Sequence, residues 1–295
     1  LYICCMSPFI SIVIPFYGTA DPVLLQRCLY SIRQQGMEEG SYEIIVADDN
    51  GKGLGGARNQ GIRQATGTYL MFVDADDYLF QNLSYCFSYL LKYTPDICSF
   101  QMCEVNRAGV IPRSFNYKWE VYGSGAEYMS KNNFMGTAWR HFFSRSFLNI
   151  HGLVFAESCF HEDEDFVAKA YCLASTTLIT DYPVYAYFRS SSSIIHERAL
   201  QVRLKRLNDF QGMISRVRNL LCSLESDEKI IPMQVKALRR RLNFLTIDYI
   251  RQMRRNKCTI KEINQRLAIL KQEGFLPLPS EGYSWKYRLV APVTV

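Results

Sequence analysis

The sequence predicts an α/β fold in which helices flank a mostly parallel central sheet, with a helical extension at the C-terminal end. Three observations lead to this prediction. Short runs of β-branched and apolar residues alternate with helical patterns over residues 1–105. Two of these runs stop at clusters of aspartate, at 48–49 and at 74–77. From residue 196 onward the chain has the pattern of basic amphipathic helices.

The composition is that of a folded globular protein. The 295 residues, 48% of them apolar and 14% aromatic, suffice for one large α/β domain with an appendage or for two small domains. Ten cysteines are scattered without a CxxC pair, which favours buried thiols in a reducing compartment over a disulfide framework or a zinc site. No apolar run approaches the ~20 residues that span a bilayer, and the opening stretch does not resemble a signal peptide. We therefore expect a cytoplasmic protein.

Charge is distributed unevenly along the chain. Between His196 and Gln272 there are 18 lysine and arginine residues against seven aspartate and glutamate residues, a local net charge of +11. The whole chain carries +6, so the remainder has a net charge of −5. This division indicates an acidic domain that carries the site and a basic C-terminal part.

Strands and helices are expected in alternation along the first part of the chain. Asp21 and Pro22 supply an N-cap and a first-turn proline for the first helix. The strands on either side of this helix form a right-handed βαβ unit, which places both strand ends at one edge of the sheet. We expect strands at 9–15, 41–47, from 68, and 96–105, two short strands around Pro183 within 177–189, and helices at 21–35, 55–66, 79–93, 124–132, 160–171, 197–224, 230–255 and 259–272.

Three aspartates, Asp74, Asp76 and Asp77, follow the buried apolar run TYLMFV within four positions. Carboxylates packed this closely repel one another and resist desolvation, and a divalent cation on hard oxygen ligands would keep them ionised. Ligands of open α/β sheets bind at the carboxyl ends of the strands, so Asp48, Asp49 and the Asp74 cluster are expected over one crevice. The alternative is a polar strand exit followed by a helix N-cap, although a cap uses one aspartate.

Residues 51–61 contain five glycines and are expected to lead into a helix. A glycine-rich turn at a helix N-terminus can present backbone amides to a phosphate group, with Lys52 and Arg58 adding positive charge. The spacing matches neither the dinucleotide fingerprint nor the P-loop, and a tight connection is the more common reason for such glycines. The sequence alone leaves both interpretations open.

Four acidic residues, at 162–165, crowd the first turn of the helix expected at 160–171. Acidic residues complement the dipole at a helix start, which is the simplest explanation. Four of them beside His161 exceed that need, and we interpret this segment as a second part of the site. His161 is either a metal ligand or a neighbour of one, or, more commonly for a lone histidine, a polar surface residue.

Five blocks of sequence, taken in order, resemble family 2 glycosyltransferases of the inverting type that act in bacterial surface-polysaccharide synthesis. They are SIVIPFYG at 11–18, EIIVADDN at 43–50, GLGGARNQGI at 53–62, GTYLMFVDADD at 67–77 and HEDEDF at 161–166. The resemblance extends over about two thirds of the chain. It implies a GT-A fold, which is Rossmann-like, and transfer of a sugar from a nucleotide-diphosphate sugar, which we expect to be UDP-linked, to a hydroxyl of a glycan or lipid-linked glycan.

The resemblance also implies roles for individual residues. Asp74 and Asp76 match the DxD motif of the family. The first approaches the ribose or sugar, and the second holds, with Asp74 beside it, a Mn²⁺ or Mg²⁺ ion that bridges the diphosphate. Asp163 matches the catalytic base. The residues that bind the nucleotide sugar also include Pro15, Tyr17, Asp48, Asp49 and Arg58, and the acceptor side includes Trp139, Arg140 and Glu162.

The chemistry explains why such residues are needed. An inverting transfer is an in-line displacement, so a carboxylate, here Asp163, must take the proton of the acceptor hydroxyl on the face opposite the leaving group. A divalent ion offsets the charge on the departing nucleoside diphosphate. We expect residues 1–105 to form the nucleotide-sugar-binding half, residues 106–195 the acceptor and catalytic-base half of the same domain, and residues 196–295 the basic helical extension.

The sequence departs from the family pattern at one place. Typical members have a helix and a further strand between the blocks EIIVADDN and GLGGARNQGI, whereas here Asn50 runs directly into Gly51-Lys52-Gly53. Either this member lacks an edge strand, or a segment is absent from this sequence. A βαβ crossover needs about a dozen residues or more, which favours the second explanation.

The basic C-terminal part has two readings that we weigh equally. A cationic amphipathic surface would suit the anionic inner face of the cytoplasmic membrane, where each lysine or arginine contributes ~1 kcal/mol. A solvated helical bundle that covers the sheet is the plain alternative. No nucleic-acid partner is expected, because the sequence has no recognisable nucleic-acid-binding motif.

Two other functions compete with sugar transfer. A nucleotidyltransferase also uses strand-end aspartates and a metal, but it would need a lysine-bearing, glycine-rich loop near the first strand, where the sequence reads PFYGTAD at 15–21. A non-catalytic module that binds a nucleotide sugar or a glycan would carry the same motifs without turnover. Hydrolysis of the donor in the presence of Mn²⁺ would separate such a module from an enzyme.

Overall fold

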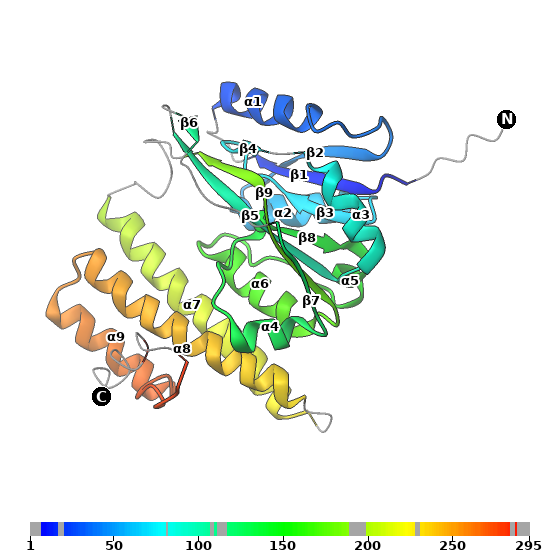
Figure 1. The fold of residues 1–295 in the computed structure, drawn as a ribbon. Helices are drawn as coiled ribbons and strands as arrows, with labels where there is room; N and C mark the ends of the chain where they lie inside the picture. Colours follow the sequence, from blue (N-terminus) through cyan, green and yellow to red (C-terminus); the bar gives the residue numbers. More distant parts are fainter. Residues whose placement is uncertain are drawn as a thin grey trace. The chain divides into compact units, whose positions relative to one another are not determined.

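The structure is a computed structural model that describes residues 7–16, 21–80, 82–106, 109–110, 117–188, 199–227, 231–283 and 287 (Figure 1). The chain divides into two compact units. The first comprises Leu1–Gly125 and Met135–His196, and the second comprises Ala126–Phe134 and Glu197–Val295. The finer division of the first unit at residue 105, into donor and acceptor halves, stays a prediction.

The first unit contains one sheet, whose described strands are β1 (Ile10–Phe16), β2 (Tyr42–Asp48), β3 (Tyr69–Phe72), β4 (Tyr78–Leu79), β5 (Ile97–Asn106), β6 (Gly109–Val110), β7 (Trp119–Tyr122), β8 (His141–Ser144) and β9 (Thr177–Phe188). Seven of them follow the order β2-β1-β3-β8-β5-β9-β4, while β6 pairs with β5 and β7 with β9. β1, β2 and β3 are parallel, as are β5 and β9, and β8 lies antiparallel between β3 and β5. The predicted α/β fold with a mostly parallel central sheet is thus confirmed.

Helices cover both faces of this sheet. They are α1 (Pro22–Arg33), α2 (Gly53–Gln64), α3 (Ser84–Tyr93), the 3₁₀ helix η1 (Ala138–Arg140), α5 (Arg145–Ile150) and α6 (Glu162–Leu173). Neighbouring residues of a strand point to opposite faces. Ile12 of β1 belongs to a core cluster that includes Ile32 of α1 and Leu90 of α3, whereas the adjacent Val13 lies against Gly61 of α2.

The first βαβ unit forms as the sequence predicts. The Asp21 side chain accepts a hydrogen bond from the Val23 N–H at 2.9 Å, and Pro22 is the first residue of α1. β1 and β2 are parallel, with Phe16 opposite Asp48 at their carboxyl ends. Since β3 also runs parallel to β1, the residues that follow β2 and β3 lie at the same edge of the sheet.

The predicted helix at 79–93 begins later than expected. Tyr78 and Leu79 pair with β9 as the strand β4, and α3 begins at Ser84. The Asn82 side chain accepts a hydrogen bond from the Ser84 N–H at 3.0 Å. An acceptor of this kind satisfies an N–H group that has no partner within the first helical turn, and it fixes the start of the helix there.

The two short strands expected around Pro183 are a single strand, β9. Pro183 faces Gln101 of β5, and the register between β5 and β9 shifts on both sides of Gln101. A proline has no N–H to donate to the ladder, so a continuous strand can pass through it only where the pairing is locally irregular. The prediction of two strands was therefore wrong.

Four residues, 49–52, connect β2 to α2. The Lys52 N–H donates to the Asp49 carbonyl at 2.9 Å, and Asn50 and Gly51 have φ angles of 49° and 75°. These residue types adopt left-handed backbone conformations most readily, so the turn closes in four residues. Within the described residues β2 pairs with β1 alone, at one end of the strand order. The prediction that a segment is absent here stays a prediction.

The second unit is helical in its described residues, which confirms the predicted helical C-terminal extension (Figure 1). Phe210 and Tyr249 stack with ring centroids 5.5 Å apart, and Arg266 donates to the Tyr249 hydroxyl and to Asn208, both at 2.8 Å. One arginine thereby connects three helices. The helices are α4 (Gly125–Lys131, in this unit from Ala126), α7 (Leu200–Glu225), α8 (Pro232–Arg255) and α9 (Ile260–Gln272).

Two arginines of α8, Arg240 and Arg241, are buried. Arg240 donates to the carbonyls of Met129 and Asn132 at 3.3 and 2.6 Å, and Arg241 donates to the carbonyl of Phe134 at 3.1 Å. Carbonyl groups at the end of a helix have no partner within that helix, so these arginines complete the end of α4. Part of the positive charge of α8 is therefore structural.

Candidate active site

The three aspartates after β3 separate into two kinds. Asp74 and Asp76 are half-buried, whereas Asp77 is only 2% exposed. Asp77 accepts hydrogen bonds from the Tyr185 hydroxyl and from the Phe188 N–H, each at 2.7 Å. Burial, followed by the charges of Asp76 and Asp74, raises the pKa of Asp77. Asp77 therefore anchors the turn to β9, and Asp74 and Asp76 remain as the two carboxylates at the surface of the site.

Tyr185 binds the backbone of Asp74. Its hydroxyl donates to Asp77 and also accepts a hydrogen bond from the Asp74 N–H at 3.1 Å. The Tyr185 ring stacks on Trp139, with centroids 4.5 Å apart, so Trp139 is buried beneath it. Arg140, the other predicted acceptor-side residue of this segment, donates to the Phe100 carbonyl at 3.2 Å. The structure places both residues in contact with the sheet next to the aspartate turn.

Asp76 is held through its backbone by Arg27 of α1, a residue that the sequence analysis did not single out. Arg27 donates to the Asp76 carbonyl at 2.6 Å, and its guanidinium lies 4.8 Å from the ring centroid of Tyr78 and 4.2 Å from that of Phe188. Burial and the charge of Asp74 raise the pKa of Asp76, and Arg27 opposes this shift. The Asp76 carboxylate thus lies in a crowded acidic environment.

Arg58 of α2 connects two distant parts of the chain. Its guanidinium is buried, with Nη2 3.0 Å from Oδ1 of Asp74 and Nη1 2.6 Å from Oε1 of Glu162. Burial alone would lower the pKa of Arg58, but the carboxylates of Asp74 and Glu162 raise it above its usual range. Arg58 was predicted to bind the nucleotide sugar; here both ends of its guanidinium are paired with protein carboxylates.

Asp163 lies next to Glu162 in the first turn of α6, beside the same guanidinium. Its pKa is raised well above the usual range, first by burial and then by the charge of Glu162, while Arg58 lowers it. The charge of Asp74 also contributes to the shift, so the two carboxylates lie within electrostatic range of each other. Asp163 and Asp74, far apart in the sequence, are connected in the structure through Arg58, which pairs with Asp74 and with Glu162, the neighbour of Asp163.

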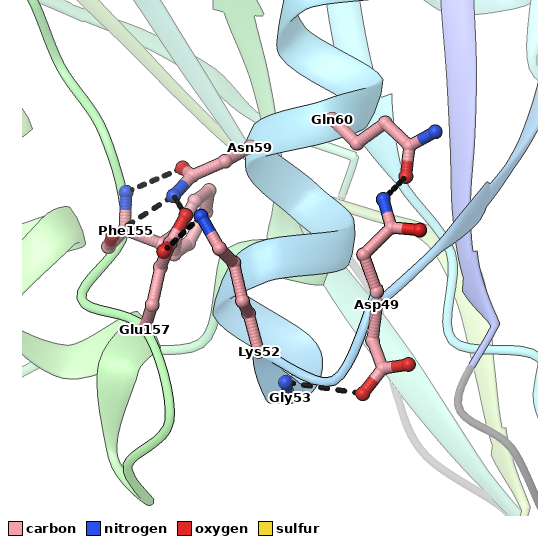
Figure 2. A network of polar contacts seen from close by, with 8 residues as sticks. Asp49, Lys52, Gly53, Asn59, Gln60, Phe155 and Glu157 are labelled. Carbon is pink, nitrogen blue, oxygen red and sulfur yellow. Dashed lines mark hydrogen bonds and ion pairs between the residues drawn. The ribbon is translucent and has the colours of Figure 1, made fainter.

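The other predicted donor-side residues lie at the ends of β1 and β2. Pro15 is buried in β1 opposite Ala47. The Asp48 carboxylate accepts a hydrogen bond from the Asn50 N–H at 2.7 Å, and the Asp49 carboxylate accepts one from the Gly53 N–H at 3.1 Å. Asp49 therefore caps the first turn of α2 (Figure 2). Tyr17 lies outside the described residues.

Asn59, also missed by the sequence analysis, binds the segment that leads to α6. Its side-chain amide donates to the Phe155 carbonyl at 3.0 Å and accepts from the Phe155 N–H at 2.8 Å. The same amide donates to Glu157 at 3.2 Å, and Glu157 forms an ion pair with Lys52 at 3.0 Å. Figure 2 shows these contacts on one side of α2. Asn59 of α2 and Lys52, which directly precedes this helix, thus hold residues 155 and 157.

Close packing explains the glycines of α2. A Cβ atom at Gly55 would come within 2.0 Å of the Ala156 carbonyl oxygen, and one at Gly61 within 2.1 Å of the Val13 side chain. The Ser158 N–H donates to the Lys52 carbonyl at 2.7 Å, directly at the start of the helix. These contacts favour the tight-connection interpretation of this stretch over a phosphate cradle.

The described residues contain no group of three or more histidine, cysteine, aspartate and glutamate side chains arranged to hold a metal ion. His161, considered as a metal ligand, occupies the position before the first turn of α6 with a φ angle of 65°. The left-handed backbone there turns the chain sharply into the helix. The assignment of Asp74 and Asp76 as the metal ligands stays a prediction.

Comparison with known proteins shows a family resemblance for part of the chain. Residues 50–147, about a third of the chain, match the model of glycosyl transferase family 2. The matched segment contains α2 and the aspartates Asp74 and Asp76, and it ends before Asp163.

Two relatives illustrate the similarity. The uncharacterized glycosyltransferase EpsJ of Bacillus subtilis is 26% identical over 226 residues, which cover 64% of this chain and 63% of EpsJ. The poly(ribitol-phosphate) beta-glucosyltransferase of Bacillus spizizenii is 36% identical over 97 residues, or 24% of this chain and 15% of that protein. The matches therefore extend over less than two thirds of the length of these curated relatives.

Solved structures share the fold of this chain. TarS 1–349 of S. aureus, in complex with UDP-GlcNAc, matches with a TM-score of 0.70 and 18% identity, over 92% of this chain and 82% of that one. The mannosyltransferase PcManGT of Pyrobaculum calidifontis, in complex with GDP-Man and Mn²⁺, matches with a TM-score of 0.54 and 15% identity, over 98% of this chain and 84% of that one. At such identities the likeness shows the fold alone, and it confirms the predicted GT-A architecture.

Proposed function

We propose that this chain transfers a sugar from a nucleotide-diphosphate sugar to a hydroxyl of a glycan or lipid-linked glycan, with inversion at the anomeric carbon. The observation that carries the proposal is the contact of Arg58 with both Asp74 and Glu162. It brings the start of α6, and with it Asp163, to the carboxyl end of β3. The match of residues 50–147 to the family 2 model and the names of the relatives support the reaction class.

The donor site that we propose lies at the ends of β1, β2 and β3. Asp48 and Asp49 are the candidates for contacts to the base or ribose, and Asp74 for contacts to the ribose or sugar. We favour a UDP-linked sugar, because TarS, whose fold is the more similar of the two, was solved with UDP-GlcNAc. The identity of the sugar is set by pocket side chains, so the family alone does not predict it.

The two carboxylates at the end of β3 fit a divalent cation that is shared with the substrate. Mg²⁺ is usually bound by one or two carboxylates together with substrate phosphates, rather than by an all-protein cage. Asp74 and Asp76 supply two hard oxygen ligands of this kind, which also accounts for the absence of a larger ligand cluster among the described residues. When bound, Mn²⁺ or Mg²⁺ would offset the negative charge of the departing diphosphate.

Asp163 is the general base in this proposal. Its half-buried carboxylate, with a raised pKa, is a stronger proton acceptor than an ordinary aspartate, and it takes the proton of the acceptor hydroxyl. Glu162, which we expected on the acceptor side, is buried against Arg58, so we assign it to positioning. We propose that Trp139 and Arg140 line the acceptor side.

The acceptor and the cellular location belong to the same proposal. Each helix described in this structure is too short or too polar to pass through a bilayer. We propose a cytoplasmic enzyme with peripheral contact to anionic lipid through exposed cations of the second unit, which would bring a lipid-linked acceptor close.

Thermal-shift measurements with a panel of nucleotide sugars, with and without Mn²⁺, test the donor proposal. A ligand at 100 times its dissociation constant adds about 2.7 kcal/mol of stability, and we expect UDP-sugars to do so in the presence of Mn²⁺. Stabilisation followed by release of the nucleoside diphosphate supports the transferase. Release of pyrophosphate would indicate a nucleotidyltransferase instead, and binding without any product would indicate a non-catalytic module.

A further inference from the structure

We propose that Arg58 and Asn59, two adjacent residues of α2 that we call the α2 clamp, position the general base relative to the donor carboxylates. Asn59 fixes residues 155–157, and Arg58 fixes Glu162, the neighbour of Asp163. The proposal rests on the function proposed above. It assigns to the GLGGARN block a role in placing the base, where the sequence suggested a contact to phosphate.

The first contact of the clamp is made by the guanidinium group of Arg58. A guanidinium is planar and rigid, and its two terminal nitrogens lie a fixed distance apart. One nitrogen pairs with Asp74 at 3.0 Å and the other with Glu162 at 2.6 Å, so the guanidinium sets the spacing between the two carboxylates. Because Asp163 follows Glu162 directly in the first turn of α6, this spacing also sets the place of the Asp163 carboxylate.

The second contact is the amide of Asn59, which is only 4% exposed. It binds both polar groups of the Phe155 peptide, as a neighbouring strand would, and reaches Glu157 as well. Neither the Asn59 amide nor the backbone of Phe155 is titratable, so the two hydrogen bonds between them do not depend on the protonation state of either partner. Residues 155–161 are the connection that enters α6, and Asn59 therefore limits where the first turn of α6 can lie.

The clamp is itself fixed to the sheet. Gly61, two residues beyond Asn59, packs so closely on Val13 of β1 that a Cβ atom would approach its side chain to 2.1 Å. Gly55 makes an equally close contact with the Ala156 carbonyl, at 2.0 Å from a Cβ atom. A helix held this closely on both sides acts as a rigid spacer between β1 and the segment before α6.

A positioning role and a purely structural role predict different kinetics. A displacement of about 1 Å in a reacting group can reduce turnover by about 10²-fold. Loss of a positioning contact therefore lowers kcat while donor binding is preserved. Loss of a structural contact lowers the melting temperature and leaves kcat of the folded fraction unchanged. Asn59 separates the two cases better than Arg58, since Asn59 has no contact with Asp74 among those described above.

The experiment compares the full chain with Asn59→Ala and with Ser11→Ala. Ser11 is a matched control: its buried hydroxyl donates to Glu43 at 2.6 Å and accepts from the Gly67 N–H at 2.8 Å, at the opposite end of the strands. For each protein the readouts are kcat, the dissociation constant of UDP-sugar with Mn²⁺, the melting temperature, and hydrogen exchange of the Phe155 amide, which donates to Asn59.

We expect Asn59→Ala to lower kcat by about 10- to 100-fold. Its donor dissociation constant should stay within about threefold of the original, because the donor residues are not touched, and the Phe155 amide should exchange faster. Ser11→Ala should lower the melting temperature with kcat and Phe155 exchange unchanged. The conservative variant Asn59→Asp keeps the acceptor for the Phe155 N–H but loses both donated bonds, so its kcat should lie between those of Asn59→Ala and the unaltered chain.

Two results would overturn the clamp. One is a kcat for Asn59→Ala no lower than that of Ser11→Ala, and the other is donor binding that weakens in parallel with kcat. Failure of the proposed function looks different: the unaltered chain would then turn over no nucleotide sugar. In that event the exchange of the Phe155 amide decides the clamp alone, since an unchanged rate in Asn59→Ala would show that Asn59 does not hold the segment.

Discussion

Arg58 in the first unit and Arg240 in the second are both buried cations, but different oxygen atoms surround them. Arg58 is paired with the carboxylates of Asp74 and Glu162, with Asp163 near by. Arg240 donates to neutral groups, the carbonyls of Met129 and Asn132 and the side chain of Asn133. The neighbouring charges raise the pKa of the first, while burial lowers the pKa of the second.

The partners of a buried arginine indicate whether its charge serves a functional site or only the fold. Carbonyls at the end of α4 need donors, and one arginine satisfies several of them at once. The carboxylates around Arg58 outnumber it, so acidic groups are left over at the surface of the first unit. An excess of buried or half-buried carboxylates lowers stability unless a bound cation or a proton neutralises them, and this excess supports our proposal that the first region is the active site.

The largest effect is expected at the carboxylate left over beside Arg58. Asp163→Asn removes the proton acceptor with little change in shape, and turnover should fall by about 10²–10⁴-fold. Binding of UDP-sugar with Mn²⁺, measured by titration calorimetry, should remain near its original value. Nearly normal turnover by this variant would remove Asp163 from the role of base, and the contrast between the two arginine sites would lose its functional meaning.

Substitution of the two arginines should lower the free energy of unfolding by different amounts. Arg58→Met leaves Glu162 buried without its partner, which we expect to cost about 3–5 kcal/mol. Arg240→Met leaves neutral carbonyls without donors, and the expected loss is about 1–3 kcal/mol. Urea unfolding, monitored through hydrogen exchange in each unit, measures both losses in free energy. A larger loss for Arg240→Met than for Arg58→Met would contradict the distinction that we draw between carboxylate-paired and carbonyl-paired arginines.

Other cations of the second unit differ from Arg240 because they are exposed to solvent. Arg254, Arg255, Lys257 and Lys261 are exposed near the turn between α8 and α9. We expect binding to vesicles with anionic lipid, and a loss of about 2 kcal/mol in the double variant Arg254→Ser/Lys257→Ser, at ~1 kcal/mol for each charge.

Arg239→Ser is the matched control for this prediction. Arg239 is also exposed on α8, but its charge is already paired with Glu225 at 2.7 Å. Its loss should change vesicle binding less than the loss of Arg254 or Lys257, neither of which has an ion pair with a described residue. Equal binding of the unaltered chain to anionic and neutral vesicles would contradict the membrane proposal and favour the solvated bundle.

The smallest effect is expected in the pH dependence of turnover. Burial and the charge of Glu162 raise the pKa of Asp163, and the base works only when it is ionised. As the pH is lowered, turnover should therefore begin to decrease at a higher pH than it would with an ordinary aspartate as the base. Glu162→Gln removes a negative charge and frees Arg58, and both changes lower the pKa of Asp163. The acidic limb of the residual kcat profile should therefore move to lower pH.

Glu164→Gln provides a graded control for this shift. The charge of Glu164 also raises the pKa of Asp163, but it contributes less than that of Glu162. The acidic limb should move in the same direction by a smaller amount. An acidic limb that stays fixed in both variants would mean that another group controls it.

The sequence predicted the elements that its local patterns determine. The capped start of α1, the parallel pair of β1 and β2, and the long helices of the second unit all follow from spacing and caps. The sequence was less successful where pairing between residues far apart in the chain determines the secondary structure. Leu79 joins β9 as a strand, and Pro183 lies inside that strand, because partners about a hundred residues apart meet there.

The candidate site shows the same limit. The resemblance singled out Asp74, Asp76 and Asp163. The cluster of three aspartates alone did not separate Asp77 from Asp74 and Asp76, because the hydroxyl that binds Asp77 belongs to Tyr185, 108 residues away. Arg58 was predicted to bind the nucleotide sugar, and local sequence could not predict its ion pair with Glu162, 104 residues away. The roles of these residues as donor, metal and base groups stay predictions.

The configuration of the sugar released from a UDP-α-linked donor tests the central claim most directly, and it needs no knowledge of the acceptor. Water can replace the acceptor hydroxyl, and NMR of the fresh product reads its anomeric configuration. We predict Mn²⁺-dependent release of the β-anomer, together with UDP, and loss of that release in Asp163→Asn. Release of the α-anomer, or of the β-anomer at an undiminished rate by Asp163→Asn, would contradict an inverting transfer with Asp163 as its base.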